Sequence, residues 1–70
     1  MKNLLFPELI GEMAKRGENQ STLANLLGIT PGSINNKMAG RTQWTISEMA
    51  LISNHYNRDK EELFKRNENY

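Results

Sequence analysis

The sequence contains no cysteine, so neither a disulfide nor a thiolate metal site can stabilise the fold. Its 70 residues form one domain of nearly the smallest size that folds on a hydrophobic core alone. Long apolar runs are missing too, because Leu4-Leu5-Phe6 is followed at once by Pro7 and Glu8. The chain therefore has neither a signal-peptide core nor the roughly 20 apolar residues of a membrane span. We expect a soluble, cytoplasmic protein with no membrane partner.

Acidic residues are absent from one long stretch, between Glu18 and Glu48. Residues 19–47 contain two basic residues, Lys37 and Arg41, together with 13 Asn, Gln, Ser or Thr residues. The rest of the chain has seven basic and eight acidic residues, so the net charge of +1 hides an uneven distribution. A surface without carboxylates and rich in amides suits contact with a phosphate backbone. The alternative is a polar face that contacts only solvent.

Few side chains are available for catalysis. His55 is the only histidine, and the absence of cysteine leaves it no thiol partner for a nucleophilic site or a metal site. The sequence also has no glycine-rich phosphate-binding loop and no cluster with metal-ligand spacing. We therefore expect no catalytic site, no metal and no cofactor.

Residues 19–40 have the pattern of two short helices joined by a tight turn. Asn19 is a suitable N-cap for the first helix, and Gly28 stands where a helix end favours positive φ. Thr30 can cap the second helix, whose first position is Pro31. Gly40 ends that helix in the same way as Gly28. This order is the helix-turn-helix arrangement of DNA-binding proteins.

The second of these helices has one apolar stripe and one polar face. Ile34 and Met38 lie about 40° apart around the helix axis and define the buried side. The opposite side is centred on Asn36, flanked by Gly32 and Ser33. Asparagine is suited to bidentate recognition of adenine in the major groove. We therefore interpret this segment as a recognition helix.

Base-reading side chains are predicted on this polar face and at its borders: Ser33, Asn35, Asn36 and Lys37. The start of the helix contributes none, because neither Pro31 nor Gly32 has a hydrogen-bonding side chain. We therefore expect few base-specific contacts.

Phosphate contacts are predicted on both sides of the recognition helix. Gln20 and Ser21 stand in the first turn of the preceding helix, where free amide groups favour an anion. Thr30 stands just before the recognition helix, and Arg41 and Thr42 open the loop that follows it. A polar first-turn residue without a ligand is the alternative interpretation of Gln20.

A later helix is predicted from the segment Thr45-Ile-Ser-Glu48, which fits a capping box. Trp44, just before it, is interpreted as a core residue and not as a base-stacking one. The expected buried side of the helix is Ile46, Met49, Ala50, Ile52 and Tyr56.

The whole chain, 1–70, is predicted to be one compact all-α domain of about five short helices. Its core is expected to span about residues 4–64, and the tail 65–70 is expected to be disordered. The predicted helices cover about 7–16, 20–27, 31–39 and 46–56, followed by a short helix that carries Leu63 and Phe64.

Several of these segments resemble the Cro/phage-repressor class of helix-turn-helix regulators. The first is Gln20-x-x-Leu23-Ala24-x-x-Leu27-Gly28-Ile29-Thr30, and the second is Ser33-Ile34-Asn35-Asn36-Lys37-Met38-x-Gly40-Arg41. The later Trp44-Thr45-x-x-Glu48-Met49 and Glu62-Leu63-Phe64 resemble small Cro-like proteins of prophages in Gram-positive bacteria. The resemblance covers about residues 4–64.

The resemblance implies a five-helix, lambda-repressor-like domain that dimerises on a two-fold operator in a bacterial host cell. It implies a phosphate contact for Gln20 and places Ser33 and Asn36 toward the groove. The sequence departs from the commoner pattern at Pro31 and Gly32, where the family often has polar readers. Because the chain stops at residue 70, we expect a Cro-type protein or a free-standing DNA-binding domain.

Two functions agree with these features of the sequence. The first is a phage-type, Cro-like transcriptional regulator that binds double-stranded operator DNA as a homodimer in a lysogeny/lysis switch. The alternative is a modulator or antirepressor that acts by contact with the cognate phage repressor. From the family resemblance, the last helix, with Phe64 and its neighbours, is the expected dimer surface.

Overall fold

The computed structural model describes residues 5–67, and within this range it consists of five α-helices without any strand. The predicted all-α fold is therefore confirmed. None of the helices between residues 5 and 67 has the length and apolar character needed to cross a membrane. Their bounds are α1 (Pro7–Lys15), α2 (Gln20–Leu27), α3 (Pro31–Met38), α4 (Ile46–Tyr56) and α5 (Lys60–Leu63). The ends of α1 and α3 differ from the prediction by one residue each, and Phe64, which was expected on the last helix, is the C-cap that follows α5.

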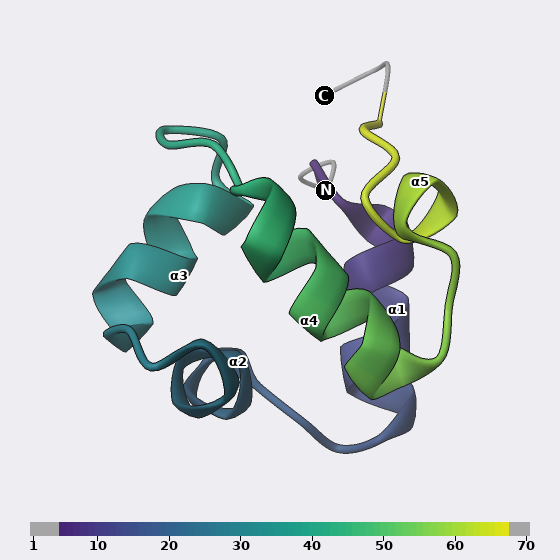
Figure 1. Cartoon of the computed structure of the whole chain (residues 1–70), viewed down its shortest axis with the longest axis horizontal. Coiled ribbons are helices and arrows are strands. Elements are labelled where there is room, and N and C mark those ends of the chain that lie inside the picture. Colours follow the sequence, from purple (N-terminus) through teal and green to yellow (C-terminus); the bar gives the residue numbers. More distant parts are fainter. Residues whose placement is uncertain (1–4, 68–70) are drawn as a thin grey trace.

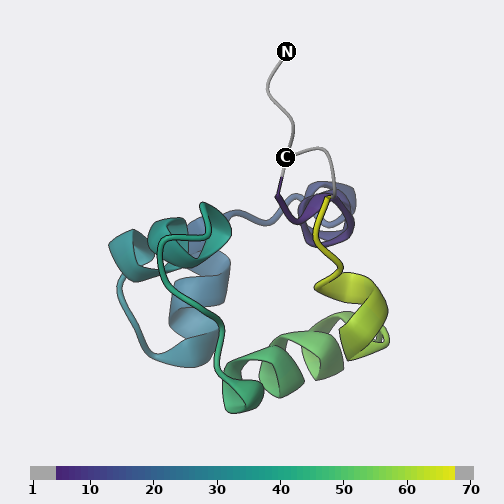
Figure 2. The ribbon, with the colours of Figure 1, turned by 90° about the horizontal axis from the view of Figure 1, so that it is seen from above.

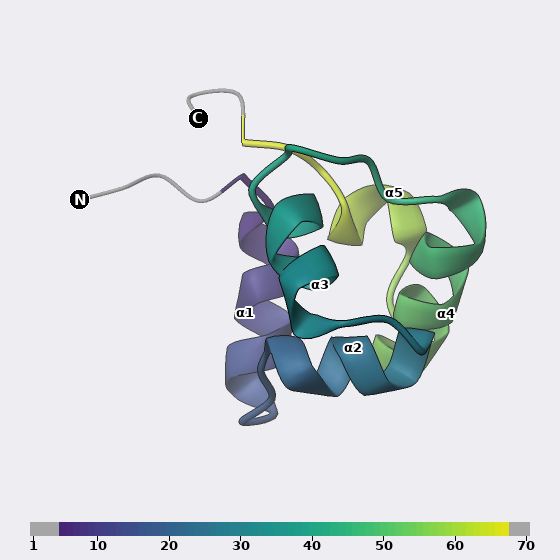
Figure 3. The same ribbon diagram turned by 90° about the vertical axis from the view of Figure 1, so that its left-hand side faces the viewer.

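The helix α4 runs along one edge of the bundle and links two pairs of helices (Figures 1 and 2). Seen from above, α2 and α3 form one side of the molecule, and α1 and α5 form the other (Figure 2). The helix α2 packs against both α3 and α4, whereas α5 packs against α1 and α4. The turn after α2 doubles back, so α3 begins beside α2 and rises away from it (Figure 3). The arrangement leaves α3 on an outer side of the bundle.

Every helix contributes at least one fully buried side chain to a common core. Removing an aliphatic or aromatic side chain of this size from water stabilises a fold by roughly 1.5–3 kcal/mol. The largest of these side chains are Leu9, Leu23, Ile34, Ile52, Tyr56 and Leu63.

Three aromatic rings form a second part of the core. Trp44 lies 6.4 Å from Phe6 and 5.3 Å from Phe64 between ring centroids, and all three pairs meet edge to face. Such pairs contribute roughly 0.5–1.5 kcal/mol beyond the area they bury. The prediction of Trp44 as a core residue is confirmed. Phe64 is buried in this cluster, so its ring is not available for the dimer surface expected on the last helix.

The buried face of α4 differs in part from the prediction. Ile52 and Tyr56 are buried as expected, but Ile46 is 73% exposed and Ala50 is also exposed. Ala50 lies about 110° around the helix from the centre of the buried face, which includes Ser53. Ile46 is the first residue of α4 and lies beyond the packed part of the helix. The prediction for Ile46 and Ala50 was therefore wrong.

The segment after α5 packs against the start of the chain. The backbone N–H of Asn67 donates a hydrogen bond to the carbonyl oxygen of Leu5, with a nitrogen–oxygen distance of 2.8 Å. The guanidinium of Arg66 lies 5.8 Å from the centre of the Phe6 ring. Residues 65–67 are thus placed, although we expected a disordered tail from residue 65. The expectations for Leu4 and for residues 68–70 lie outside the described residues.

Candidate nucleic-acid interface

The start of α2 is fixed by a reciprocal pair of hydrogen bonds. The backbone N–H of Thr22 donates to Oδ1 of Asn19 at 3.2 Å. In return, the backbone N–H of Asn19 donates to Oγ1 of Thr22 at 3.3 Å. Two amide groups that a helix start leaves without partners are satisfied in this way. The predicted N-cap at Asn19 is confirmed.

The turn between α2 and α3 follows the predicted chemistry. Gly28 has φ of +70°, and the next backbone N–H, of Ile29, donates to the carbonyl oxygen of Ala24 at 3.0 Å. Oγ1 of Thr30 then accepts a hydrogen bond from the backbone N–H of Ser33 at 3.2 Å. The same hydroxyl donates to Oγ of Ser33 at 3.1 Å, so both side chains hold the start of α3. The prediction that Thr30 is the N-cap of this helix is therefore confirmed.

Packing fixes the orientation of α3 on α2. Leu23 of α2 and Ile34 of α3 are both completely buried. On the outer side, Nε2 of Gln20 donates to Oδ1 of Asn35, with a distance of 3.5 Å between the atoms. A predicted phosphate-contacting residue and a predicted base-reading residue are thus brought together across the two helices.

Asn36 and Arg41 form a second contact of this kind. Both residues are exposed, and Nη1 of Arg41 donates to Oδ1 of Asn36 at 3.2 Å. An amide oxygen has two lone pairs, so Oδ1 can still accept from a base while the NH2 group donates to it. Arg41 therefore orients the Asn36 amide without blocking bidentate recognition.

Lys37 is engaged within the protein. Its Nζ lies 3.0 Å from Oε1 of Glu48 and donates to the backbone carbonyl of Gln43 at 3.1 Å. It also lies 6.0 Å from the centre of the Trp44 ring, and only 13% of the side chain is exposed. These contacts join the end of α3 to the start of α4. These contacts were not predicted, because they depend on how the loop after α3 brings the start of α4 beside Lys37.

Glu48 is the first carboxylate after the acid-free stretch, and it remains ionised. Partial burial raises its pKa, but the backbone N–H of Thr45 and the Lys37 ammonium lower it, and the net result is a pKa below 4.5. The N–H of Thr45 donates to Oε1 of Glu48 at 2.9 Å, as predicted for a capping box. Lys37 and Glu48 thus neutralise each other, which leaves Arg41 as the exposed cation of residues 19–47.

The remaining predicted site residues differ in how accessible they are. Ser21 and Thr42 are exposed, whereas Ser33 is half-buried beside Thr30. Gly32 is exposed, and a Cβ atom built there would meet only Oγ1 of Thr30, at 3.9 Å. The protein's own packing therefore does not require glycine at this position, although glycine costs helix stability. A glycine that the protein's own packing does not require suits a surface to which the backbone of a ligand comes close.

Comparison with known proteins gives one match. The model of the family described as the BetR domain matches residues 8–70, which covers all five helices except the first residue of α1. No curated protein and no solved structure matches the chain.

Proposed function

The chain belongs to the BetR domain family, a family of small helix-turn-helix-like domains, and we propose that it is a transcriptional regulator that binds operator DNA. In this proposal α3 enters the major groove, and the protein acts as a Cro-like component of a phage lysogeny/lysis switch. The resemblance of residues 20–41 to Cro and phage repressors supports the Cro-like role in a phage switch.

The observation that carries the proposal is the exposed pair Asn35 and Asn36 on α3. Both amides stand on the helix that follows the turn, and neighbouring side chains hold both of them through their Oδ1 atoms. An amide that is already oriented loses less conformational entropy when it binds a base edge. Asn36 is the stronger candidate for adenine, because its partner Arg41 is itself suited to a phosphate.

Phosphate contacts are proposed for the residues that surround α3. Gln20 and Ser21 present the free amides of the first turn of α2, and Arg41 and Thr42 present the loop after α3. Thr30 can add a contact through its backbone, since its side chain caps α3. Lys37 contributes a base contact only if its ion pair with Glu48 opens.

A homodimer is proposed because a single α3 has few base-reading side chains. Two copies on a two-fold operator would double both the base contacts and the phosphate contacts. The large apolar side chains exposed on the described surface are Ile46 and Leu51, both on α4.

Selection from a pool of random duplexes tests this function. The purified protein should enrich sites with two-fold symmetry whose half-sites lie about one helical turn apart, roughly 10 base pairs. A selected pool without a common sequence would contradict operator recognition. Selection with Asn36→Ala should yield sites in which one position of each half-site is relaxed.

The second function, contact with a cognate phage repressor, is favoured by one observation. Lys37 is neutralised by Glu48, so α3 offers little free positive charge to DNA. A regulator that acts on a partner protein needs less positive charge than one that acts on phosphate. Pull-down with the N-terminal domain of that repressor, with and without substitutions in α3, distinguishes the two functions.

A further inference from the structure

Arg66 is an exposed cation near the end of the described chain. Other basic residues are neutralised within the protein: Lys15, Arg16, Lys37 and Arg58 each form an ion pair with a carboxylate. Within residues 5–67, by contrast, the guanidinium of Arg66 forms neither an ion pair nor a hydrogen bond. Its N–H groups are therefore available to a ligand.

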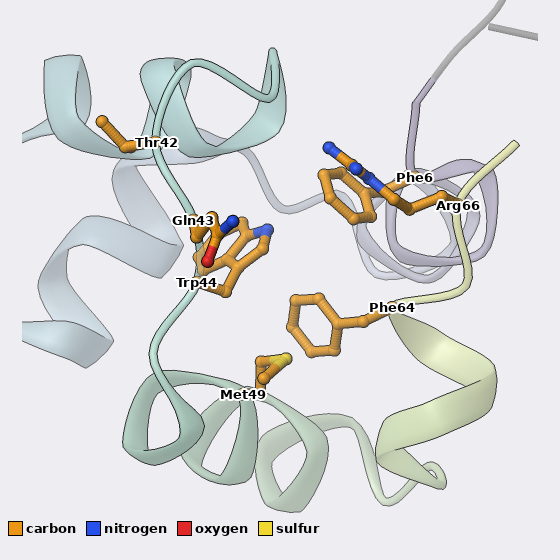
Figure 4. Close-up of a pocket in the computed structure, with 7 residues that line it drawn as sticks. All are labelled: Phe6, Thr42, Gln43, Trp44, Met49, Phe64 and Arg66. Atoms are coloured by element: carbon orange, nitrogen blue, oxygen red, sulfur yellow. The ribbon is translucent and has the colours of Figure 1, made fainter.

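The guanidinium of Arg66 lies against the turn that ends α3. A Cβ atom built at Gly40 would lie 3.3 Å from Nη2 of Arg66 and 2.8 Å from Cδ2 of Leu5. The hydrogen bond from the Asn67 N–H to the Leu5 carbonyl oxygen holds the backbone of this segment. Figure 4 shows the Arg66 side chain extending across the Phe6 ring toward the loop after α3. Packing therefore brings the end of the chain to the end of the recognition helix.

Arg41 stands next to Gly40 on the same turn. Its backbone N–H donates to the Asn36 carbonyl oxygen at 2.9 Å, and its Nη1 donates to Oδ1 of Asn36 at 3.2 Å. Arg41 is thus held beside α3 by local hydrogen bonds. Two arginines accordingly flank Gly40, one as its neighbour in the sequence and the other through tertiary packing.

The charge of these two arginines is not balanced within the described part of the chain. No acidic residue stands between Glu18 and Glu48, and Glu48 is paired with Lys37. Neither Arg41 nor Arg66 forms an ion pair with a carboxylate of residues 5–67. Two like charges beside one turn repel each other, and a nearby anion relieves this repulsion. Arginine suits phosphate in particular, because its planar N–H groups match two phosphate oxygens.

The contact with Phe6 orients Arg66 without occupying its N–H groups. The guanidinium carbon lies 5.8 Å from the centre of the ring. A cation–π contact uses the charge of the guanidinium, so the N–H groups can still donate to an anion. A long side chain that is already held in place loses less conformational entropy when it binds.

We propose that Arg66 is a further phosphate contact of the DNA interface. The inference rests on the proposed function, in which the loop after α3 lies against the DNA backbone. Arg66 and Arg41 then bind phosphates on the same side of α3. Because Lys37 is neutralised by Glu48, the interface takes its second free cation from the end of the chain and not from the recognition helix.

Salt-dependent anisotropy tests the proposal with the full chain, a selected operator duplex and a random duplex. Arg66→Gln should weaken binding to both duplexes about threefold to tenfold and reduce the slope of log K against log salt by about 1. Its preference for the operator should stay unchanged, because a phosphate carries no sequence information. Arg66→Lys, which keeps the charge, should retain the slope of the wild type.

Lys65→Gln is the matched control. Lys65 is an exposed neighbour with the same charge, and it does not lie within 4 Å of the Cβ position of Gly40. Its loss should change the slope less than the loss of Arg66 does. Urea denaturation of both variants checks that the fold is retained.

The Nε–Hε resonance of Arg66 gives a second measurement, on the wild-type protein. This resonance is identified by its absence from the spectrum of Arg66→Gln, and it should shift when duplex is added.

Failure of this inference is distinguishable from failure of the proposed function. If the wild type prefers the operator but Arg66→Gln behaves like Lys65→Gln, the role of Arg66 is overturned and the proposed function stands. An Arg66 resonance that does not move at saturating duplex would have the same meaning. A changed base preference in Arg66→Gln would overturn the assignment to phosphate. A wild type that binds neither duplex would overturn both proposals.

Discussion

Arg41 holds Asn36 through two hydrogen bonds. Its Nη1 donates to the side-chain Oδ1 at 3.2 Å, and its backbone N–H donates to the Asn36 carbonyl oxygen at 2.9 Å. The exposed cation of the loop and the outermost amide of α3 are therefore coupled before any ligand binds. The proposed function assigns the two residues different partners on DNA, a base edge for Asn36 and a phosphate for Arg41.

The first prediction separates these two roles. Asn36→Ala should cost roughly 1–3 kcal/mol on the operator and relax its specificity at one base pair. Arg41→Ala should weaken binding to all duplexes and reduce the slope of log K against log salt by about 1. Fluorescence anisotropy on the operator and on its single-base variants measures both effects. A loss for Asn36→Ala that is the same on every duplex would rule out base reading by that residue.

Lys37 is the subject of the second prediction. Because its ammonium is paired with Glu48 and nearly buried, Lys37→Gln should lower the free energy of unfolding and leave base preference unchanged. Urea denaturation measures the first effect, and competition between operator variants measures the second. Lys60→Gln, at the exposed first position of α5, is the control for loss of one positive charge. A change in base preference at unchanged stability would restore Lys37 as a base-reading residue.

Two exposed helical glycines without close neighbours provide the third prediction. Gly32→Ala and Gly11→Ala should each leave the fold intact and stabilise it by up to about 1 kcal/mol, because alanine favours helix. Only Gly32→Ala should weaken DNA binding, since only Gly32 lies at the start of α3. Thermal unfolding and anisotropy are compared for both variants. Unchanged DNA affinity in Gly32→Ala would exclude a close approach of DNA to this turn.

The fourth prediction compares two glycines with positive φ. Gly17→Ala should cost roughly 1–2 kcal/mol, the ordinary cost of a left-handed alanine, because nothing lies within 4 Å of its Cβ position. A Cβ at Gly40 would lie 2.8 Å from Cδ2 of Leu5, so Gly40→Ala should cost about 1–3 kcal/mol more than Gly17→Ala. Chemical denaturation of both variants gives the difference. An equal loss of stability in the two variants would mean that the Leu5 side chain moves away from the new methyl group without cost.

The last prediction concerns acid stability. Glu12 is buried on α1 and lies 2.5 Å from Nη1 of Arg58, which holds the pKa of this carboxyl below 4.5. The folded protein therefore binds this proton less readily than the unfolded chain does. The pair contributes its full stability above pH 4.5, and the contribution is lost as the pH falls through the lowered pKa.

Glu12→Gln should accordingly flatten the loss of stability below pH 4.5, as measured by urea denaturation across a pH series. Glu61→Gln, which removes an exposed carboxylate of α5, serves as the control. Its free energy of unfolding should fall below pH 4.5 as steeply as that of the wild type. Parallel curves for the wild type and Glu12→Gln would show that the Arg58 contact does not govern acid unfolding.

The features that were predictable from the sequence depend on local chemistry. Asn19, Thr30 and Thr45 were recognised as N-caps because a cap acts on a backbone N–H three residues away. Gly28 and Gly40 were recognised because positive φ is a property of a single residue. Together these positions define the helix-turn-helix almost to the residue.

The features that were not predictable depend on which helices meet. Ile46 matches a helical apolar pattern as well as Met49 does, but Ile46 is exposed whereas Met49 packs against the core, and only the tertiary arrangement decides between them. Glu12 and Arg58 stand 46 positions apart, and Lys37 and Glu48 stand on different helices, so neither ion pair follows from a local pattern. The pocket lined by Phe6, Trp44, Met49 and Phe64 (Figure 4) also arises from tertiary packing, since its walls come from the start, the middle and the end of the described chain.

Specific binding to double-stranded DNA is the central claim, and fluorescence anisotropy tests it most directly. The purified protein is titrated against a labelled duplex from upstream of its own gene and against a random duplex of equal length, at several salt concentrations. We predict submicromolar binding to the first duplex, much weaker binding to the second, and a salt slope that reflects the phosphates contacted. Weak binding that is equal on both duplexes would contradict the claim and would favour a partner repressor as the target.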